Sequence, residues 1–255
     1  IVFYITAFLL GSIWGSFSNV CIKRLPYKLS ISGRSYCLNC KENIKWYDNI
    51  PIISYIVLKA KCRNCSTKID NEYFLVELIS AISFLLIFHF YGVSLICLLF
   101  FILTIFFIII FFIDLKHFII PNELSYPLML IGFGKTFLIN SNILLFPNFK
   151  QSLIGGVLGF FIIWLIIFLY KKLKNIEGMG LGDAKLLSAL GFWFGWVALP
   201  FILIFSSLIA LIYSLPSLIK KTKSMTTQIP FGPYLIIGCV IYIVLVDQIF
   251  FYVLR

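Results

Sequence analysis

Residues 95–114 read LICLLFFILTIFFIIIFFID, a run of nineteen uncharged residues that ends in the acid Asp114. A soluble core does not need a stretch this long, whereas a helix that crosses a bilayer needs about 20 consecutive apolar residues. The run therefore predicts a membrane-spanning helix, which we place at 94–113. An acid at the edge of such a helix is a candidate functional residue, because charges at membrane depth are costly.

Apolar runs of similar length recur along the chain, which is 61% hydrophobic and only 12% charged. This composition predicts an all-α polytopic membrane protein with about eight transmembrane helices. The stretch 184–218 is too long for one span, and we divide it near Leu199-Pro200. The candidate spans are 1–20, 73–91, 94–113, 118–139, 152–170, 184–198, 199–218 and 231–252. We expect three parts: a first helix (1–20), a polar loop (21–72) and a seven-helix core (73–255).

The basic residues are distributed unevenly between the predicted loops. If the N-terminus lies outside, the segments 21–72, 114–117, 171–183 and 219–230 face one side, and 18 of the 21 Lys and Arg residues lie there when Lys185 at its edge is included. By the positive-inside rule this side is cytoplasmic. The net charge of +11 then reflects membrane topology and not a nucleic-acid partner. The first span lacks a basic leading region and a cleavage site, so we expect an uncleaved helix.

Two C-x-x-C pairs occupy the polar loop, Cys37/Cys40 and Cys62/Cys65. Four thiolates at this spacing are typical of a tetrahedral zinc site. The loop is too small and polar to fold by burial alone, and a metal would supply the missing stability. A pair of disulfides is the alternative, which a reducing cytoplasm disfavours. We therefore predict a small cytoplasmic zinc-binding loop domain whose site is structural. The other cysteines, which we expect to be ordinary buried residues, are Cys21, Cys97 and Cys239.

Between the two Cys pairs lies an apolar stretch, WYDNIPIISY at 46–55. Its Trp and Tyr residues favour a hairpin or short helix that rests on the membrane surface. A surface that binds a protein partner is equally consistent with this composition.

A second acid stands at the predicted membrane edge, in GMGLGDAKLL at 178–187. Asp183 follows three alternating glycines, which let the backbone approach other chain segments closely. One interpretation is that Asp183 only caps the helix that follows. However, the topology derived from Lys and Arg places Asp183 and Asp114 at the same membrane depth. Asp247 lies 16 residues into the last span, ~24 Å away at ~1.5 Å per residue, so it cannot join them.

Two carboxylates held close together share a proton and titrate as a pair. One of them, ionised, draws a proton from water, while the other donates a hydrogen bond to a scissile carbonyl. The arrangement predicts aspartyl peptide hydrolysis at the cytoplasmic membrane edge. The sequence contains neither the H-E-x-x-H pattern of zinc proteases nor the G-x-S-x-G pattern of serine hydrolases.

The chain resembles the type IV prepilin peptidases, a family of membrane leader peptidase/N-methyltransferases. The resemblance covers most of the chain and rests on the order and spacing of several motifs. These are Gly15-Ser16-Phe17-Ser18-Asn19-Val20 with Arg24-Leu25-Pro26, the two Cys pairs, Ile50-Pro51-Ile52-Ile53-Ser54-Tyr55, Lys61-Cys62-Arg63-Asn64-Cys65, Asp114 with Ile120-Pro121-Asn122, Gly178-Met179-Gly180-Leu181-Gly182-Asp183, and Pro230-Phe231-Gly232-Pro233. One departure is Phe74, where the family usually has Pro.

The resemblance implies that Asp114 and Asp183 are the catalytic aspartates. It also implies that the substrates are type IV prepilin or pseudopilin precursors, cleaved just after a Gly on the cytoplasmic side of the bacterial inner membrane. In the family, the new N-terminal residue is then methylated with S-adenosylmethionine as the methyl donor. The chain shows no glycine-rich nucleotide loop, so we do not assign residues to that cofactor.

Two other classes of protein remain as alternatives. An ion- or proton-coupled transporter also carries acids in its spans, but it would place them near the middle of the membrane in broken helices. A membrane-anchored zinc scaffold would account for the cysteines and would leave the glycine-flanked Asp183 unexplained.

Overall fold

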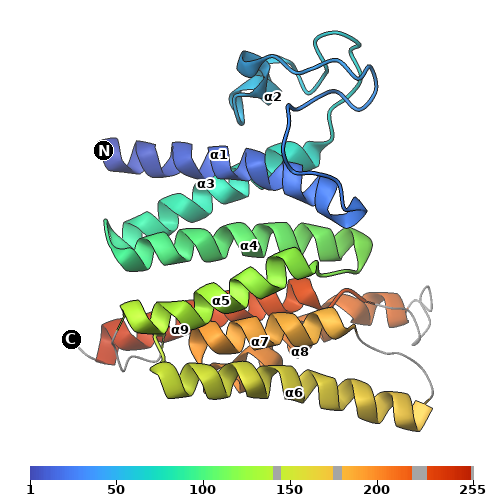
Figure 1. Cartoon of the computed structure of the whole chain (residues 1–255). Helices are drawn as coiled ribbons and strands as arrows, with labels where there is room; N and C mark the ends of the chain where they lie inside the picture. The colour runs from blue at the N-terminus through green and yellow to red at the C-terminus, as the bar shows by residue number, and fades with distance from the viewer. Residues whose placement is uncertain (140–144, 175–179, 220–228, 254–255) are drawn as a thin grey trace. The chain divides into compact units, whose positions relative to one another are not determined.

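The computed structural model describes residues 1–139, 145–174, 180–219 and 229–253, with the backbone alone at 174, 216–219 and 247–253. The described part is helical and contains no strand, and its isolated bridges include Tyr36–Asn43 and Lys61–Lys68 (Figure 1). The α-helices are α1 Val2–Arg24, α2 Ile53–Val57, α3 Asn71–Tyr91, α4 Leu95–His117, α5 Asn122–Leu138, α6 Phe149–Lys174, α7 Leu181–Phe194, α8 Ala198–Ile219 and α9 Gly232–Val253, with short 3₁₀ helices η1 Leu25–Tyr27 and η2 Trp46–Asn49.

Five of the described helices, α1, α3, α4, α6 and α8, are long and apolar enough to cross a membrane, and a shorter apolar stretch covers Gly232–Val246 of α9. The prediction of an all-helical, multi-span membrane protein is confirmed. The count of eight spans is not, because α5 has 17 residues and α7 only 14.

The division between α7 and α8 differs from the prediction near Leu199-Pro200. The chain turns at Gly195, whose φ of +77° ends α7. Glycine adopts this left-handed conformation without a steric penalty. Pro200 instead lies in the first turn of α8, where a missing N–H costs nothing.

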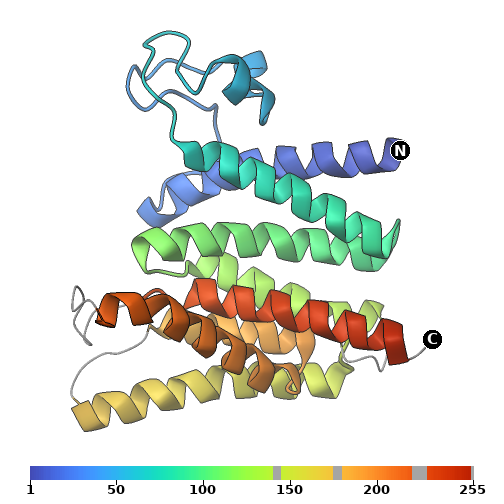
Figure 2. The same cartoon turned by 180° about the vertical axis from the view of Figure 1, so that it is seen from behind.

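The chain divides into two compact units, residues 1–109 and 110–255, with the boundary inside α4. In the first unit, α1 and α3 lie side by side in both views (Figures 1 and 2). A methyl group on Gly15 would lie 2.7 Å from the Cα of Glu77, so glycine is what lets the two backbones approach. The side chain of Asp70 accepts a hydrogen bond from the N–H of Glu72 and caps the start of α3, and Gly92 is the C-cap residue at its other end.

In the second unit, α7 contacts α5, α6, α8 and α9. Small residues let α6 and α7 approach closely: a methyl group on Gly159 would lie 2.6 Å from the carbonyl oxygen of Leu187. Most side chains of α7 are buried, including Trp193, which donates a hydrogen bond to the carbonyl of Leu128 in α5. This helix, which carries Asp183, is therefore held on several sides.

Lys135 of α5 is buried in the second unit, with 3% of its surface exposed. Its ammonium group has no hydrogen-bond partner in the described part of the chain. It lies 4.9–5.4 Å from the ring centroids of Phe146, Trp193 and Phe194. Cation–π attraction therefore replaces the hydrogen bonds that a buried ammonium usually makes.

Candidate active site and metal centre

Asp114 and Asp183 both lie in the second unit and are nearly inaccessible, at 4% and 8% exposure. Asp114 occupies the last turn of α4, and Asp183 is the third residue of α7. The two carboxylates are near enough to interact electrostatically. The structure thus places near each other two acids that are 69 positions apart in the sequence.

Asp183 is not the N-cap residue of α7, but its carboxylate makes a capping contact in the first turn. The N-cap residue is Gly180, and its backbone N–H donates a hydrogen bond to the Asp183 carboxylate. Gly178 and Met179 of the predicted glycine loop lie outside the described residues. The capping interpretation is therefore consistent with the structure, which also places Asp183 near Asp114.

The N–H of Gly232 donates a hydrogen bond of 3.0 Å to Oδ2 of Asp114. Gly232 is the first residue of α9, so this N–H has no partner within its own helix. A methyl group at Gly232 would lie 2.6 Å from the same Oδ2. Glycine is therefore the residue that permits this approach.

Ile120 lies in the connection between α4 and α5 and packs against two of these glycines. A methyl group on Gly182 would lie 3.1 Å from Ile120 Cβ, and one on Gly232 would lie 3.1 Å from Ile120 Cδ1. The connection begins at Phe118, whose φ is +57°. This conformation is uncommon for an aromatic residue, and it turns the chain at the end of α4. Three separate motifs of the sequence thus meet beside Asp114.

A polar tether links the starts of α5 and α7. The ammonium group of Lys185 donates a hydrogen bond of 2.7 Å to Oδ1 of Asn122 and lies over the ring of Tyr126. Lys185 stands two positions after Asp183, so this contact fixes the first turn of α7 relative to α5.

Sequence reasoning missed the roles of Gly232, Ile120 and the Lys185–Asn122 pair. A glycine between two prolines, at the start of an apolar run, is the one signal that pointed to Gly232. Asp247 lies in α9, but its side chain is outside the described part of the structure, so its predicted separation from the other acids stays a prediction.

The four predicted metal ligands come together in the first unit. The Sγ atoms of Cys37, Cys40, Cys62 and Cys65 all lie within 4.8 Å of one another. The two pairs form the same kind of turn: the N–H of Cys37 bonds to Glu42 O, and that of Cys62 bonds to Thr67 O. An isolated bridge flanks each turn, between positions 36 and 43 and between positions 61 and 68.

This thiol cluster fits a tetrahedral zinc ion. Zn–S bonds of about 2.3 Å place the sulfurs about 3.8 Å apart, and the Cys37 and Cys65 sulfurs are 3.7 Å apart. The Thr67 hydroxyl lies 3.2 Å from Cys65 Sγ, and this hydrogen bond lowers the pKa of the Cys65 thiol to about 5. Thiolates are the form that binds metals. As predicted, Cys21, Cys97 and Cys239 are buried apart from this site.

Comparison with known proteins gives matches over most of the chain. Residues 9–91 match the bacterial peptidase A24 N-terminal domain, and residues 101–215 match the type IV leader peptidase family. The chain is 34% identical to a prepilin leader peptidase/N-methyltransferase of Pseudomonas aeruginosa, covering 97% of this chain and 92% of that protein. It is 36% identical to a protein of the same name from Vibrio cholerae, covering 94% of this chain and 96% of that protein. No solved structure matches the chain.

Proposed function

This chain belongs to the type IV leader peptidase family, and on that premise we propose that it cleaves the leader peptide of type IV prepilin-like precursors and methylates the new N-terminal residue. The observation that carries the peptidase proposal is the meeting of Asp114, Asp183 and the Gly232 amide at one place. The transporter alternative is not supported: the relatives are named as peptidases, and both acids lie in the terminal turns of their helices.

Asp114 and Asp183 act as a general acid–base pair in this proposal. One carboxylate takes a proton from water as the water oxygen attacks the scissile carbonyl carbon, and the other carboxyl group gives its proton to the carbonyl oxygen. The tetrahedral intermediate then collapses: the C–N bond breaks, the departing nitrogen receives a proton from the pair, and a hydroxyl group of the intermediate returns a proton to the pair as the new carboxyl group forms. The two acids return to their starting state with one proton shared between them.

The surrounding residues hold this pair in place. The Gly232 N–H donates a hydrogen bond to Asp114 Oδ2, and this bond restricts the rotation of that carboxyl group. Ile120 packs between Gly182 and Gly232, which sets the spacing of the starts of α7 and α9. Positioning of this kind matters because a misplacement of about 1 Å can cost about 100-fold in rate.

We further propose that α5, α7 and α9 complete a set of eight spans, because α7 packs among helices that are themselves long enough to cross the membrane. With the N-terminus outside, the basic segments lie in the cytoplasm, and the two acids then face the cytoplasmic side of the inner membrane. The division into a first helix, a loop at 21–72 and a peptidase core at 73–255 stays a prediction.

We propose a structural zinc ion held by Cys37, Cys40, Cys62 and Cys65, a set of four sulfurs that closes the coordination shell and leaves no position for a substrate. The methyl donor in this proposal is S-adenosylmethionine. The described part of the chain shows no glycine-rich nucleotide loop, so no residue is assigned to methyl transfer.

The test is incubation of the purified chain in lipid with a synthetic prepilin-like precursor, followed by mass spectrometry of the products. We expect cleavage after the Gly that ends the leader. With S-adenosylmethionine present, the new N-terminus should gain the mass of one methyl group. An intact precursor would contradict the peptidase assignment, and cleavage without methylation would contradict only the second activity.

A further inference from the structure

Helix α2 presents an apolar face that nothing in the described chain covers. Ile53, Ile56 and Val57 are spaced as i, i+3 and i+4, so they share one side of the helix. Their exposed fractions are 56%, 62% and 68%. Three large apolar side chains exposed together on one short helix indicate a surface that is covered in use.

The depth of α2 follows from its attachment to α3. Glu77 accepts a 2.7 Å hydrogen bond from the N–H of Ile52, the residue just before α2. The ring of Tyr55 stacks on Phe74 with centroids 5.2 Å apart, and the Tyr55 hydroxyl donates to Asn71 at 2.8 Å. Three separate contacts therefore hold α2 against the first two turns of α3.

The backbone at this attachment is in an unusual conformation. Ile52 has φ +64°, which is uncommon for a β-branched residue. Such a conformation persists only where its surroundings hold it, and here the carboxylate of Glu77 does so. The position of α2 along α3 is therefore specified rather than incidental.

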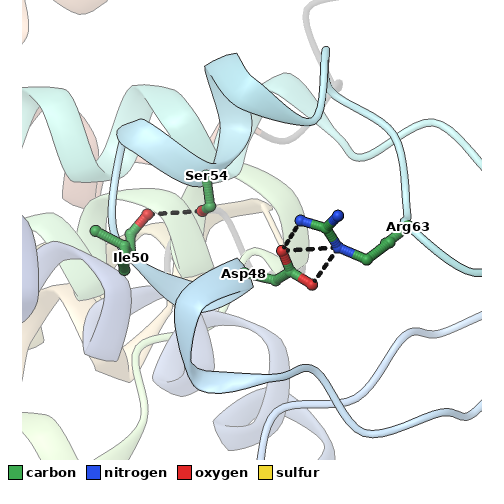
Figure 3. A network of polar contacts seen from close by, with 4 residues as sticks. All are labelled: Asp48, Ile50, Ser54 and Arg63. Carbon is green, nitrogen blue, oxygen red and sulfur yellow. Dashed lines mark hydrogen bonds and ion pairs between the residues drawn. The ribbon is translucent and has the colours of Figure 1, made fainter.

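The segment that carries α2 is also braced internally. Arg63 donates three hydrogen bonds to the carboxylate of Asp48, and Ser54 donates one to the carbonyl of Ile50 (Figure 3). The Arg63 side chain lowers the pKa of Asp48, so the ion pair persists at neutral pH. The 46–57 segment and the turn at Cys62–Cys65 thus behave as one piece.

Helix α3 is itself long and apolar enough to cross a membrane, so its contacts with α2 determine the depth of α2 in the bilayer. Its 21 residues span about 31 Å, close to the ~30 Å hydrocarbon thickness. Asn71 therefore lies at one interface, and Glu77 lies about 9 Å below it. An amphipathic element on a membrane surface lies about 5–10 Å deep, at the boundary between headgroups and acyl chains. The contacts with α3 thus hold α2 at interfacial depth.

The exposed apolar surface of α3 begins at the same membrane depth as α2. One side of α3 packs on α1 through Gly11 and Gly15. Exposed apolar residues recur every three or four positions on the rest of its surface, beginning in the second turn: Leu75, Ile79, Ile82 and Leu86. The exposed face of α2 and this lipid-facing stripe begin at one depth, so a single bilayer covers both.

The charge around α2 also favours contact with a membrane surface. Residues 41–68 contain six basic and two acidic residues. Basic residues beside apolar ones favour the surface of a membrane that contains anionic lipids.

We propose that Ile53, Ile56 and Val57 form an interfacial anchor that inserts into the headgroup–acyl boundary of the bilayer and seats the four-cysteine module on the membrane surface. The occupant of this face is lipid, not a protein partner. The proposal does not depend on the peptidase assignment, because it concerns lipid contact and not chemistry at Asp114.

The test places a reporter on this face in the full chain. Ile56→Trp, labelled throughout with 5-fluorotryptophan, is reconstituted in nanodiscs of phosphatidylethanolamine and phosphatidylglycerol and followed by ¹⁹F NMR. Two agents broaden the signals: a phospholipid with a nitroxide on its acyl chain near the headgroup, and a gadolinium chelate confined to water. Trp164, 39% exposed on α6, reports lipid contact, and Trp193, 1% exposed, reports burial.

We expect the new signal to be broadened by the lipid nitroxide, as that of Trp164 is, and to be protected from gadolinium, with the Trp193 signal affected by neither. Val57→Trp, on the same face, should behave in the same way and guards against a local disturbance by one substitution. Broadening of both reporters by gadolinium, without an effect of the lipid nitroxide, would overturn the proposal. It would indicate that this face meets water and is free for a protein partner.

Discussion

The N–H of Gly232 donates a 3.0 Å hydrogen bond to Oδ2 of Asp114, although the two residues are 118 positions apart. The contact joins the end of α4 to the start of α9. It gives a buried carboxyl group a fixed orientation and uses a backbone donor that the helix leaves unpaired. In our account, this contact holds one half of the catalytic pair.

Gly232→Ala tests this contact. Its methyl group would lie 2.6 Å from Asp114 Oδ2, so α9 or the carboxyl group must shift. We expect cleavage of a prepilin-like peptide to fall about 100-fold, the cost of a displacement of about 1 Å. The control is Gly134→Ala, because a methyl group at that glycine meets nothing within 4 Å. Equal activity of both variants would show that this close approach is unimportant.

The tether between α5 and α7 gives a second prediction. Lys185→Met removes the hydrogen bond to Asn122 and keeps most of the apolar stem. A hydrogen bond from a charged group contributes about 1.5–3 kcal/mol, so we expect kcat to fall at least about tenfold with a smaller change in KM. Lys185→Arg should recover part of the loss. If the two residues act together, Asn122→Ala should add little to Lys185→Met, whereas fully additive losses would contradict the tether.

Metal content tests the cysteine cluster. We expect one zinc ion per chain by elemental analysis, and its loss in Cys37→Ser, since three thiolates hold zinc less tightly than four. The variant should be cut faster by added protease within residues 21–72, while its peptidase activity falls less than that of the aspartate variants. Cys97→Ser, at a buried thiol in α4, is the matched control and should retain the metal. A metal-free chain with oxidised thiols would refute the zinc site.

Lys135 provides a prediction about stability. Burial of an ammonium group costs several kcal/mol, and cation–π contacts return about 2 kcal/mol or somewhat more. Lys135→Met fills the same space without a charge, so we expect a higher thermal unfolding temperature of the purified chain. Lys150→Met, which changes an exposed residue, should leave the thermal unfolding temperature unchanged. A lower unfolding temperature for Lys135→Met would show that the aromatic rings compensate fully for the lost hydration.

The long helices were predictable because their apolar runs match the thickness of a bilayer. The predicted spans 73–91 and 94–113 correspond to α3 and α4 within a few residues at each end. The break between α7 and α8 was misplaced because Pro200 is a conspicuous signal in the sequence, whereas the positive φ of Gly195, which lies close to Pro147, is visible only in the structure. Local patterns report helix length well and tertiary turns poorly.

For the candidate site, residue types and membrane depth were enough to predict that Asp114 and Asp183 meet. The Gly232 amide and Ile120 were not predicted, because a pattern along the sequence carries no information on which distant backbone group approaches a carboxylate. Phe74 replaces the proline usual in the family, and its stacking on Tyr55 gives this departure a structural role. The pairing of Lys185 with Asn122 likewise appears only in three dimensions.

The most direct test of the central claim is the cleavage rate of Asp183→Asn, with Asp114→Asn beside it, measured on a prepilin-like precursor by mass spectrometry. Asn keeps the shape of Asp but cannot exchange a proton with water, and loss of general acid–base catalysis costs about 10²–10⁴-fold. We expect both variants to fold and insert normally, to lose cleavage, and to methylate a precursor that is already cleaved. Cleavage at the normal rate by either variant would contradict the aspartyl mechanism.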